Sequence, residues 1–323
     1  MYHISKKNIK SCWHAAKQVK AKTGRSFVCH FVDSLWCNVR YGCEAEQYAS
    51  GDFYKMKSFD RKDTYTIGRS YEVRKLMNGS VDMHFLSNKR DFNTFFSSFI
   101  RRDWVSCENS DLKKLEQFVM SHDRVIVKPM GGMKGKGIFE FDKSNLESLN
   151  DLVGKKILLE ECIASHPLLN FSNKSLNTIR IITLLGKDGN VQVLKAALRC
   201  GVGDALVDNM SAGGVAYPVN INYGRIDGPG LAGTYSLDDR NYIYVHPGTD
   251  TFMVGYEIPF WEEVLSVVKN AASKLPQVRL VGWDVAVTEY GAELIEGNSR
   301  PGPATLEYFG GQRGFYKVVM SQL

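Results

Sequence analysis

The sequence predicts an α+β protein in which a mostly helical N-terminal lobe, residues 1–84, precedes a larger β-rich part, residues 85–323. Three observations predict this class. Residues 7–22 are basic with helical spacing, short apolar stretches alternate with turn residues from residue 124 onward, and two acidic strands meet at a turn near residue 290. The 323 residues, 44% of them hydrophobic and 24% charged, are enough for two or three lobes.

Composition argues against several classes of protein. The seven cysteines are scattered and form no CxxC pair, which favours reduced thiols and a cytoplasmic protein over a disulfide framework or a zinc site. We expect neither a membrane span nor a signal peptide, because no apolar run is long enough and residues 1–7 lack an apolar core. The net charge is +6, but no basic run is interleaved with aromatic residues, so we expect anionic phosphate substrates and no nucleic acid. No pattern indicates an oligomeric state.

The helices are predicted from local patterns. In the N-terminal lobe, residues 26–43 are aromatic and rich in cysteine without a clear period, and residues 48–71 mix polar with aromatic side chains. Two further helices are expected at residues 91–96 and 111–119; the second begins with an Asp and has apolar residues at helical spacing.

The β-rich part contains five segments typical of strands, which are residues 124–129, 138–141, 157–160, 178–184 and 191–199. The last two are predicted to form a hairpin, because Asp188-Gly189 between them is a favoured tight turn. Residues 259–275 predict an amphipathic helix, whose inward side chains are expected to be Trp261, Val264, Leu265, Val268 and Ala272.

A second hairpin carries three oxygen-bearing side chains on one predicted face. Because strand side chains alternate, Glu296 and Asn298 point the same way. A three-residue loop, Glu289-Tyr290-Gly291, with Gly291 in the left-handed region would place Asp284 opposite Glu296, whereas a two-residue loop would turn Asp284 to the other face. Two carboxylates and an amide are hard oxygen donors that suit Mg²⁺.

The alternative is a hairpin whose acids only face water. Ala286 and Leu294 share the predicted face with the acids, which favours partial burial, and buried acids need a partner. In the predicted register Thr288 pairs with Ala292. We therefore predict a metal site on this hairpin.

The segment from Lys128 to Gly137 predicts a phosphate-binding loop. A strand delivers Lys128, and four glycines with Lys134 and Lys136 lead into the next strand. Glycines such as Gly132 let the backbone approach a polyphosphate, and lysines supply positive charge. Because a strand follows instead of a helix, the segment is neither a Walker loop nor a Rossmann fingerprint, and we interpret it as a lid. The alternative is a solvated loop, but Lys128 lies in an apolar strand and needs an anionic partner.

Other charged residues have weaker patterns. Glu160 and Glu161 end an apolar strand whose backbone could meet an adenine edge, although a plain strand end is the simpler interpretation. Arginine suits bidentate contact with phosphate or carboxylate, and a structural ion pair is the equal alternative. The three arginines concerned are Arg180 and Arg199, on neighbouring predicted strands, and Arg300, after the acidic hairpin.

Taken in order, VIVKP, GGMKGKG, LLEE, TIRI, the Asp284 strand and IEGNSRPG resemble the ATP-grasp superfamily over about residues 85–323. The runs TIRIITLL, ALRCGVGDALVDNMSAGG and GWDVAVTEYGAELIEGNSRPG look most like its sugar-transfer-associated group, which is similar to carboxylate–amine ligases of surface polysaccharide pathways. The resemblance implies the ATP-grasp fold, two α+β lobes that clamp ATP. The lid-bearing subdomain would span about residues 120–162 and the metal-binding subdomain about residues 163–323.

The resemblance also implies roles around the phosphates. Lys128, and Lys89 before it, would contact the nucleotide phosphates, and Gly132 and Lys136 would belong to the lid that closes over them. Lys134, also in the lid, would clamp the transferring phosphoryl group.

Around adenine, the resemblance implies that Glu161 and Ile163 contact the base through their backbones, with Glu160 on the same strand. His166 occupies the place of the family's usual ribose carboxylate. The hairpin donors, Asp284, Glu296 and Asn298, would hold one or two Mg²⁺.

The implied reaction joins a small-molecule carboxylate to an amine, either of them sugar-linked or an amino acid. ATP phosphorylates the carboxylate and the amine attacks the acyl phosphate, while Arg180 and Arg300 stabilise the acyl phosphate and the oxyanion. One alternative is a small-molecule or sugar kinase on the same scaffold. The other is a non-catalytic nucleotide-binding protein, which the metal donors and lid lysines disfavour.

Overall fold

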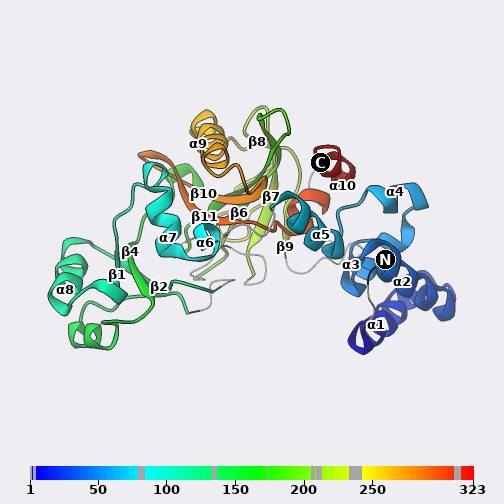
Figure 1. Cartoon of the computed structure of the whole chain (residues 1–323), viewed down its shortest axis with the longest axis horizontal. Helices are drawn as coiled ribbons and strands as arrows, with labels where there is room; N and C mark the ends of the chain where they lie inside the picture. The colour runs from blue at the N-terminus through cyan, green and yellow to red at the C-terminus, as the bar shows by residue number, and fades with distance from the viewer. Residues whose placement is uncertain are drawn as a thin grey trace.

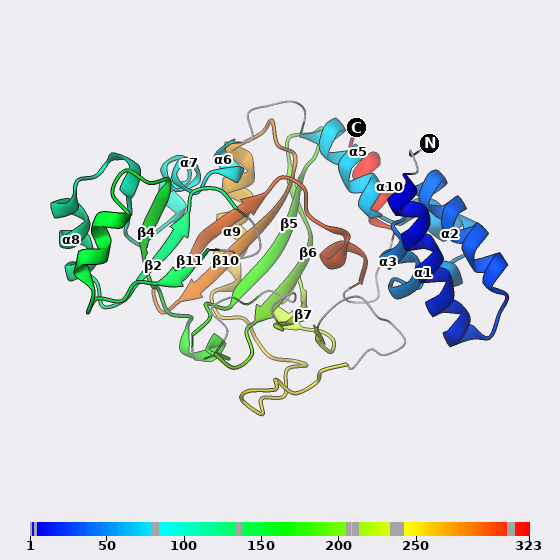
Figure 2. The ribbon, with the colours of Figure 1, turned by 90° about the horizontal axis from the view of Figure 1, so that it is seen from below.

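A computed structural model of the chain describes residues 2, 5–78, 84–132, 137–172, 174–204, 208, 213–232, 242–308 and 314–323. A large antiparallel sheet forms the middle of the molecule (Figure 1). A smaller sheet and a group of N-terminal helices lie at its two opposite ends (Figure 2).

The large sheet has the strand order β11-β10-β5-β6-β7-β8, with β9 beside β7. Its long strands are rich in Val, Ile, Leu and Thr, which fit a pleated, buried surface. The strands are β5 (Thr178–Leu185), β6 (Val191–Cys200), β7 (Val215–Asn220), β8 (Arg225–Ile226), β9 (Leu231–Ala232), β10 (Leu280–Thr288) and β11 (Gly291–Asn298). All nine residues of β10 are buried, so this strand runs through the centre of the core.

Helices cover both faces of the large sheet. Helix α9 (Trp261–Lys274) packs on one face, with α6 (His84–Ser87) and α7 (Lys89–Phe95) against β11. The other face packs against α5 (Ile67–Met77) and α10 (Phe315–Met320). The prediction for α9 is confirmed for Trp261, Val264, Val268 and Ala272, and the fifth inward residue that we predicted, Leu265, is only partly buried.

The small sheet has the order β1-β4-β2-β3 and is antiparallel throughout. Its strands are β1 (Trp104–Ser106), β2 (Val125–Pro129), β3 (Phe139–Glu140) and β4 (Ile157–Glu161), and helix α8 (Leu112–Ser121) packs on it around a separate apolar core. Strand β1 and helix α8, which belong to this sheet and its core, both begin before residue 120, where we expected the lid-bearing subdomain to start.

The N-terminal helices have a third core of their own. They are α1 (Lys6–Thr23), α2 (Phe27–Tyr41), α3 (Ala45–Ser50) and α4 (Ser58–Asp63). Helix α5 also precedes the boundary expected at residue 84, yet it packs against the large sheet. Within the described part of the chain we find no helix with the length and apolar character that a bilayer span requires.

Candidate functional site

The acidic hairpin, β10 and β11, places Asp284 opposite Glu296 as predicted, but its loop length and its register differ from the prediction. The loop contains two residues, because Thr288 pairs with Gly291 and not with Ala292, so the predicted loop was wrong. A β-bulge between Asp284 and Val285 then shifts the register by one residue. Asp284 consequently lies opposite Glu296, as predicted, and Asn298 lies opposite Gly282.

Gly291 has a φ of 109° and closes the turn, as its predicted positive φ requires. A Cβ at this position would lie 2.5 Å from the Glu263 carboxylate oxygens. We expect Gly291→Ala to lower the free energy of unfolding by about 1–3 kcal/mol, measured by urea denaturation. Gly302→Ala is the matched control, because a Cβ there meets nothing within 4 Å; equal losses in the two variants would contradict this account.

Asp284 is buried and held by two arginines. Arg180 Nη2 donates to Asp284 Oδ2 at 3.0 Å, Arg180 Nε donates to Oδ1, and Arg199 Nη2 lies 2.7 Å from Oδ2. Burial alone would raise the pKa of Asp284, but the two guanidinium groups outweigh it and hold the pKa well below its usual range. Oδ2 faces two guanidinium nitrogens, whereas Oδ1 accepts from Arg180 Nε, and the carboxylate also contacts Glu296.

The other two donors, Glu296 and Asn298, are exposed beside Asp284. The protein packed around Glu296, and next the Asp284 carboxylate, raise the pKa of Glu296 to about 7, although its side chain reaches solvent. Asn298 Oδ1 accepts a hydrogen bond from the backbone N–H of Arg300 at 2.9 Å. Two adjacent carboxylates and an amide oxygen on one sheet face fit a hard divalent cation, whose charge would relieve the repulsion between the acids.

The predicted anionic partner of Lys128 is Glu160 in this structure. The two side chains form an ion pair across β2 and β4, and Glu160 is buried. Lys89, at the start of α7, is half-buried in the same region. Burial lowers the pKa of Lys89, and Glu296, Lys128 and Glu160 are the charged groups that act on it. The fold thus brings the two lysines that we predicted for phosphate binding close to the charges of the acidic hairpin.

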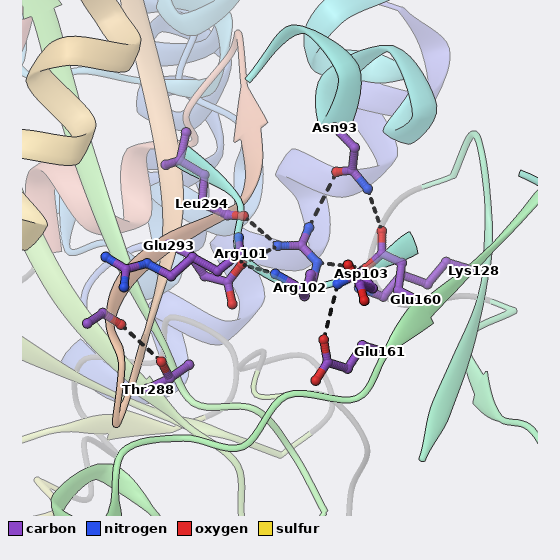
Figure 3. Close-up of polar contacts among 11 residues, drawn as sticks. Asn93, Arg101, Arg102, Asp103, Lys128, Glu160, Glu161, Thr288, Glu293 and Leu294 are labelled. Atoms are coloured by element: carbon purple, nitrogen blue, oxygen red, sulfur yellow. Dashed lines mark hydrogen bonds and ion pairs between the residues drawn. The ribbon is translucent and has the colours of Figure 1, made fainter. Parts of the chain in front are cut away.

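Arg102 links the two sheets in a buried polar network (Figure 3). Its Nε donates to Glu160 of β4 at 3.1 Å, and its Nη1 donates to Glu293 of β11 at 3.1 Å. Asn93 of α7 donates to Glu160 at 3.0 Å and accepts from Arg102. Burial raises the pKa of Glu160, but Lys128 and Arg102 outweigh it and keep this carboxylate ionised.

The residues expected near adenine lie at the end of β4 and just after it. The backbone N–H of Glu161 donates to the Asp103 carbonyl at 2.9 Å, and its carboxylate accepts from the Asp103 N–H. Ile163 comes next in the chain after Cys162, whose N–H donates to Arg124. Among the described residues, no hydrogen-bond partner is found for the backbone N–H and carbonyl of Ile163.

His166 caps a 3₁₀ turn, and its backbone is hydrogen-bonded to β10. Its backbone N–H donates to the Val287 carbonyl at 2.7 Å, and its Nδ1 accepts from the Leu168 N–H at 3.2 Å. The imidazole therefore has a structural partner in addition to any ribose contact.

Not all of the expected residues gather here. The guanidinium group of Arg300 lies 3.9 Å from the centre of the Tyr71 ring, on α5, and so points to the N-terminal side. Gly132 is exposed and has a φ of 126°, which favours glycine. Lys134 and Lys136 lie outside the described residues.

Sequence reasoning missed three polar residues of the site, which are Asn93, Arg102 and Thr178. Asp208 accepts from the Thr178 N–H at 3.0 Å and lies 3.5 Å from Arg199. The adjacent arginines Arg101 and Arg102, just before β1, could have drawn attention to this position. Nothing in the sequence showed which of the two would be buried.

Three comparisons bear on this architecture. The family model described as "Sugar-transfer associated ATP-grasp" matches residues 75–317. No curated protein matches the sequence.

Solved structures give distant similarities. An ADP complex of an N5-carboxyaminoimidazole ribonucleotide synthetase is 12% identical over 67% of this chain and 45% of its own, with a TM-score of 0.42. The ATP-grasp ligase PsnB, complexed with minimal precursor, Mg and ADP, is 14% identical over 76% of this chain and 61% of its own, with a TM-score of 0.44. D-alanyl-alanine synthetase A from Vibrio cholerae O1 biovar eltor str. N16961 is 12% identical over 74% of this chain and 65% of its own, with a TM-score of 0.43.

The chain thus spans less than two thirds of each of these three proteins. Assignment to a family does not depend on these distant similarities, because the family model covers most of the sequence. On that match the chain belongs to the sugar-transfer associated ATP-grasp family.

Proposed function

We propose that this protein is an ATP-dependent carboxylate–amine ligase that works through an acyl phosphate. The observation that supports the proposal best is the convergence of Lys89, Lys128 and Glu296, from three separate elements, in one electrostatic neighbourhood. Lysines suit the phosphates of ATP, and the carboxylates suit the cation that accompanies them. We propose ATP and Mg²⁺ as the cofactors.

In this proposal the hairpin donors Asp284, Glu296 and Asn298 hold Mg²⁺. When bound, Mg²⁺ would neutralise charge on the transferring phosphoryl group. Arg180 and Arg199 keep the Asp284 carboxylate ionised and fix its orientation, so that it can serve as a metal ligand.

The chemistry needs little from the protein beyond binding and orientation. A substrate carboxylate oxygen attacks the γ-phosphorus of ATP, the bond to the bridging oxygen breaks, and ADP leaves. The amine nitrogen then attacks the acyl carbon, phosphate leaves with the former carboxylate oxygen, and the amine proton passes to solvent. No general base is needed in the first step, because a carboxylate is already ionised near neutral pH.

The experiment that tests the proposal measures ADP release while amino acids and hexuronic acids are screened as carboxylates against simple amines. We expect ADP release only when both a carboxylate and an amine are present, and a hydroxamate when hydroxylamine replaces the amine. A phosphorylated sugar without hydroxamate would refute ligation in favour of a kinase.

Lys128 is expected to bind ATP phosphates. We expect Lys128→Met to weaken ATP binding by about 10–100-fold, since it removes a charge-assisted contact of about 1.5–3 kcal/mol, measured by isothermal titration. Glu160 keeps Arg102 and Asn93 as partners, so the fold should persist. Lys156→Met, an exposed lysine beside the same strand pair, should bind ATP like the parent protein; equal affinity in both variants would refute the assignment of Lys128.

For the biological setting, we propose a role in surface polysaccharide biosynthesis, with sugar-linked or amino-acid substrates. The family's description as sugar-transfer associated supports this.

A further inference from the structure

Helix α2 has its polarity reversed relative to an ordinary surface helix. Its buried side is comparatively polar and contains His30, Ser34, Cys37, Asn38 and Tyr41. Its outward side carries Val28, Val32 and Trp36, which are 63%, 59% and 54% exposed and recur at every fourth position. Such spacing places them on one stripe of the helix.

Helix α1 extends this apolar stripe. Trp13 of α1 makes edge contacts with Phe27 and Phe31 of α2, at ring-centroid distances of 4.5 and 5.4 Å. Trp13 and Ile9 are themselves 43% and 42% exposed. Trp13 thus meets α2 at the residues that directly precede Val28 and Val32. We call the exposed apolar side chains of the two helices, Ile9, Trp13, Val28, Val32 and Trp36, the α1–α2 face.

Lysines border the α1–α2 face. Helix α1 contains six lysines and no acidic residue. Lys10, Lys17 and Lys20 are exposed, and Lys17 Nζ lies 5.6 Å from the centre of the Trp13 ring.

The net positive charge of the chain is concentrated in residues 1–41, which include α1 and α2. Residues 1–41 contain eight lysines and arginines and one acid, whereas the chain as a whole has a net charge of +6. The remaining residues are therefore slightly acidic, and the positive potential belongs to this pair of helices. The pair lies at the end of the molecule opposite the small sheet (Figure 2).

We propose that the α1–α2 face docks this protein onto a membrane surface that contains anionic phospholipids. A helix that rests on a bilayer buries Trp and aliphatic side chains at the headgroup level while its lysines meet the lipid phosphates. This inference goes beyond the proposed function and does not rest on it.

Charge and composition favour a bilayer over other occupants. A second copy of the chain would place two strongly cationic faces against each other, and like charges repel. A protein partner is less favoured because lysine is depleted at protein–protein interfaces, whereas this face is rich in it. The helical pair also exposes aliphatic and Trp side chains that a nucleic-acid phosphate backbone would leave in water.

The test is co-sedimentation of the full chain with vesicles. Vesicles of phosphatidylcholine with about 30% phosphatidylglycerol should bind the protein, and vesicles of phosphatidylcholine alone should not. Each lysine near such a surface contributes about fivefold in affinity, so Lys10→Glu/Lys17→Glu/Lys20→Glu should bind on the order of 100-fold more weakly. Trp36→Ser should also bind more weakly and should lose part of the vesicle-induced blue shift of tryptophan fluorescence.

The control variant makes the same charge change elsewhere, as Lys113→Glu/Lys114→Glu/Lys269→Glu, at exposed positions of α8 and α9. It should bind anionic vesicles like the parent protein, and unchanged circular dichroism melting should show that every variant is folded. Equal binding to both lipid mixtures, equal loss in the control variant, or no vesicle binding would overturn the proposal. So would a dimer that Trp36→Ser dissociates, or binding to a short DNA duplex in the absence of vesicle binding.

Discussion

Glu296→Gln is expected to lower turnover by about 1,000-fold or more, because in the proposed reaction it removes one of the two carboxylates that would hold the cation beside the transferring phosphoryl group. The replacement keeps the size of an exposed side chain, so the thermal unfolding midpoint should not fall. Turnover is measured as ADP release with the substrate pair found by screening.

Glu289→Gln is the matched control on the same hairpin. Glu289 lies in the exposed turn, outside the donor face, and its replacement should leave turnover unchanged. Turnover by Glu296→Gln at the parent rate would show that the cation is held elsewhere. Asp284→Asn should be equally inactive but less stable, because it leaves Arg180 and Arg199 without their buried carboxylate.

Arg102→Met is expected to be the most destabilising of these substitutions, with a loss of about 3–5 kcal/mol in the free energy of unfolding. The Arg102 side chain is 1% exposed, and it neutralises Glu160 and Glu293, which are 2% and 1% exposed. Its removal leaves the Glu293 carboxylate with only backbone donors in a buried position. The measurement is urea denaturation followed by circular dichroism.

Arg101→Met is the control, because the neighbouring arginine pairs with Glu263 at an exposed site where about 1 kcal/mol or less is expected. Adding Glu293→Gln to Arg102→Met should recover part of the loss, since the unpaired buried charge disappears. If Arg102→Met cost no more than Arg101→Met, the network between the sheets would contribute nothing to stability.

The arrangement of the acidic hairpin could be predicted because its information is local. Alternation along a strand places Glu296 and Asn298 on one face whatever the rest of the chain does. The predicted loop length was wrong, and the bulge between Asp284 and Val285 compensated for it. A bulge has no reliable sequence signature of its own.

Partners far apart in the sequence could not be predicted. Lys128 clearly needed an anion, but Glu160 lies 32 residues away and Glu293 lies 191 residues from Arg102. The first pair requires that β2 and β4 pair with each other, and the second requires that the two sheets come together.

The N-terminal lobe was predicted to be mostly helical, but neither the bounds nor the buried side of α2 could be predicted, because residues 26–43 show no clear period. Periodicity analysis expects one apolar buried side, and α2 has polar residues inside and apolar residues outside. The apolar outer side of α2, which makes the helix hard to recognise from its sequence, is also the feature that indicates a docking surface.

The central claim is that a substrate carboxylate becomes an acyl phosphate at this site. Its most direct test uses the carboxylate that supports ADP release, labelled with ¹⁸O at both carboxylate oxygens, together with ATP and the amine. Ligation transfers one of those oxygens to phosphorus, so mass spectrometry of the inorganic phosphate should find one ¹⁸O per molecule, matched to each amide formed. Unlabelled phosphate, or phosphate retained on the product, would contradict the account.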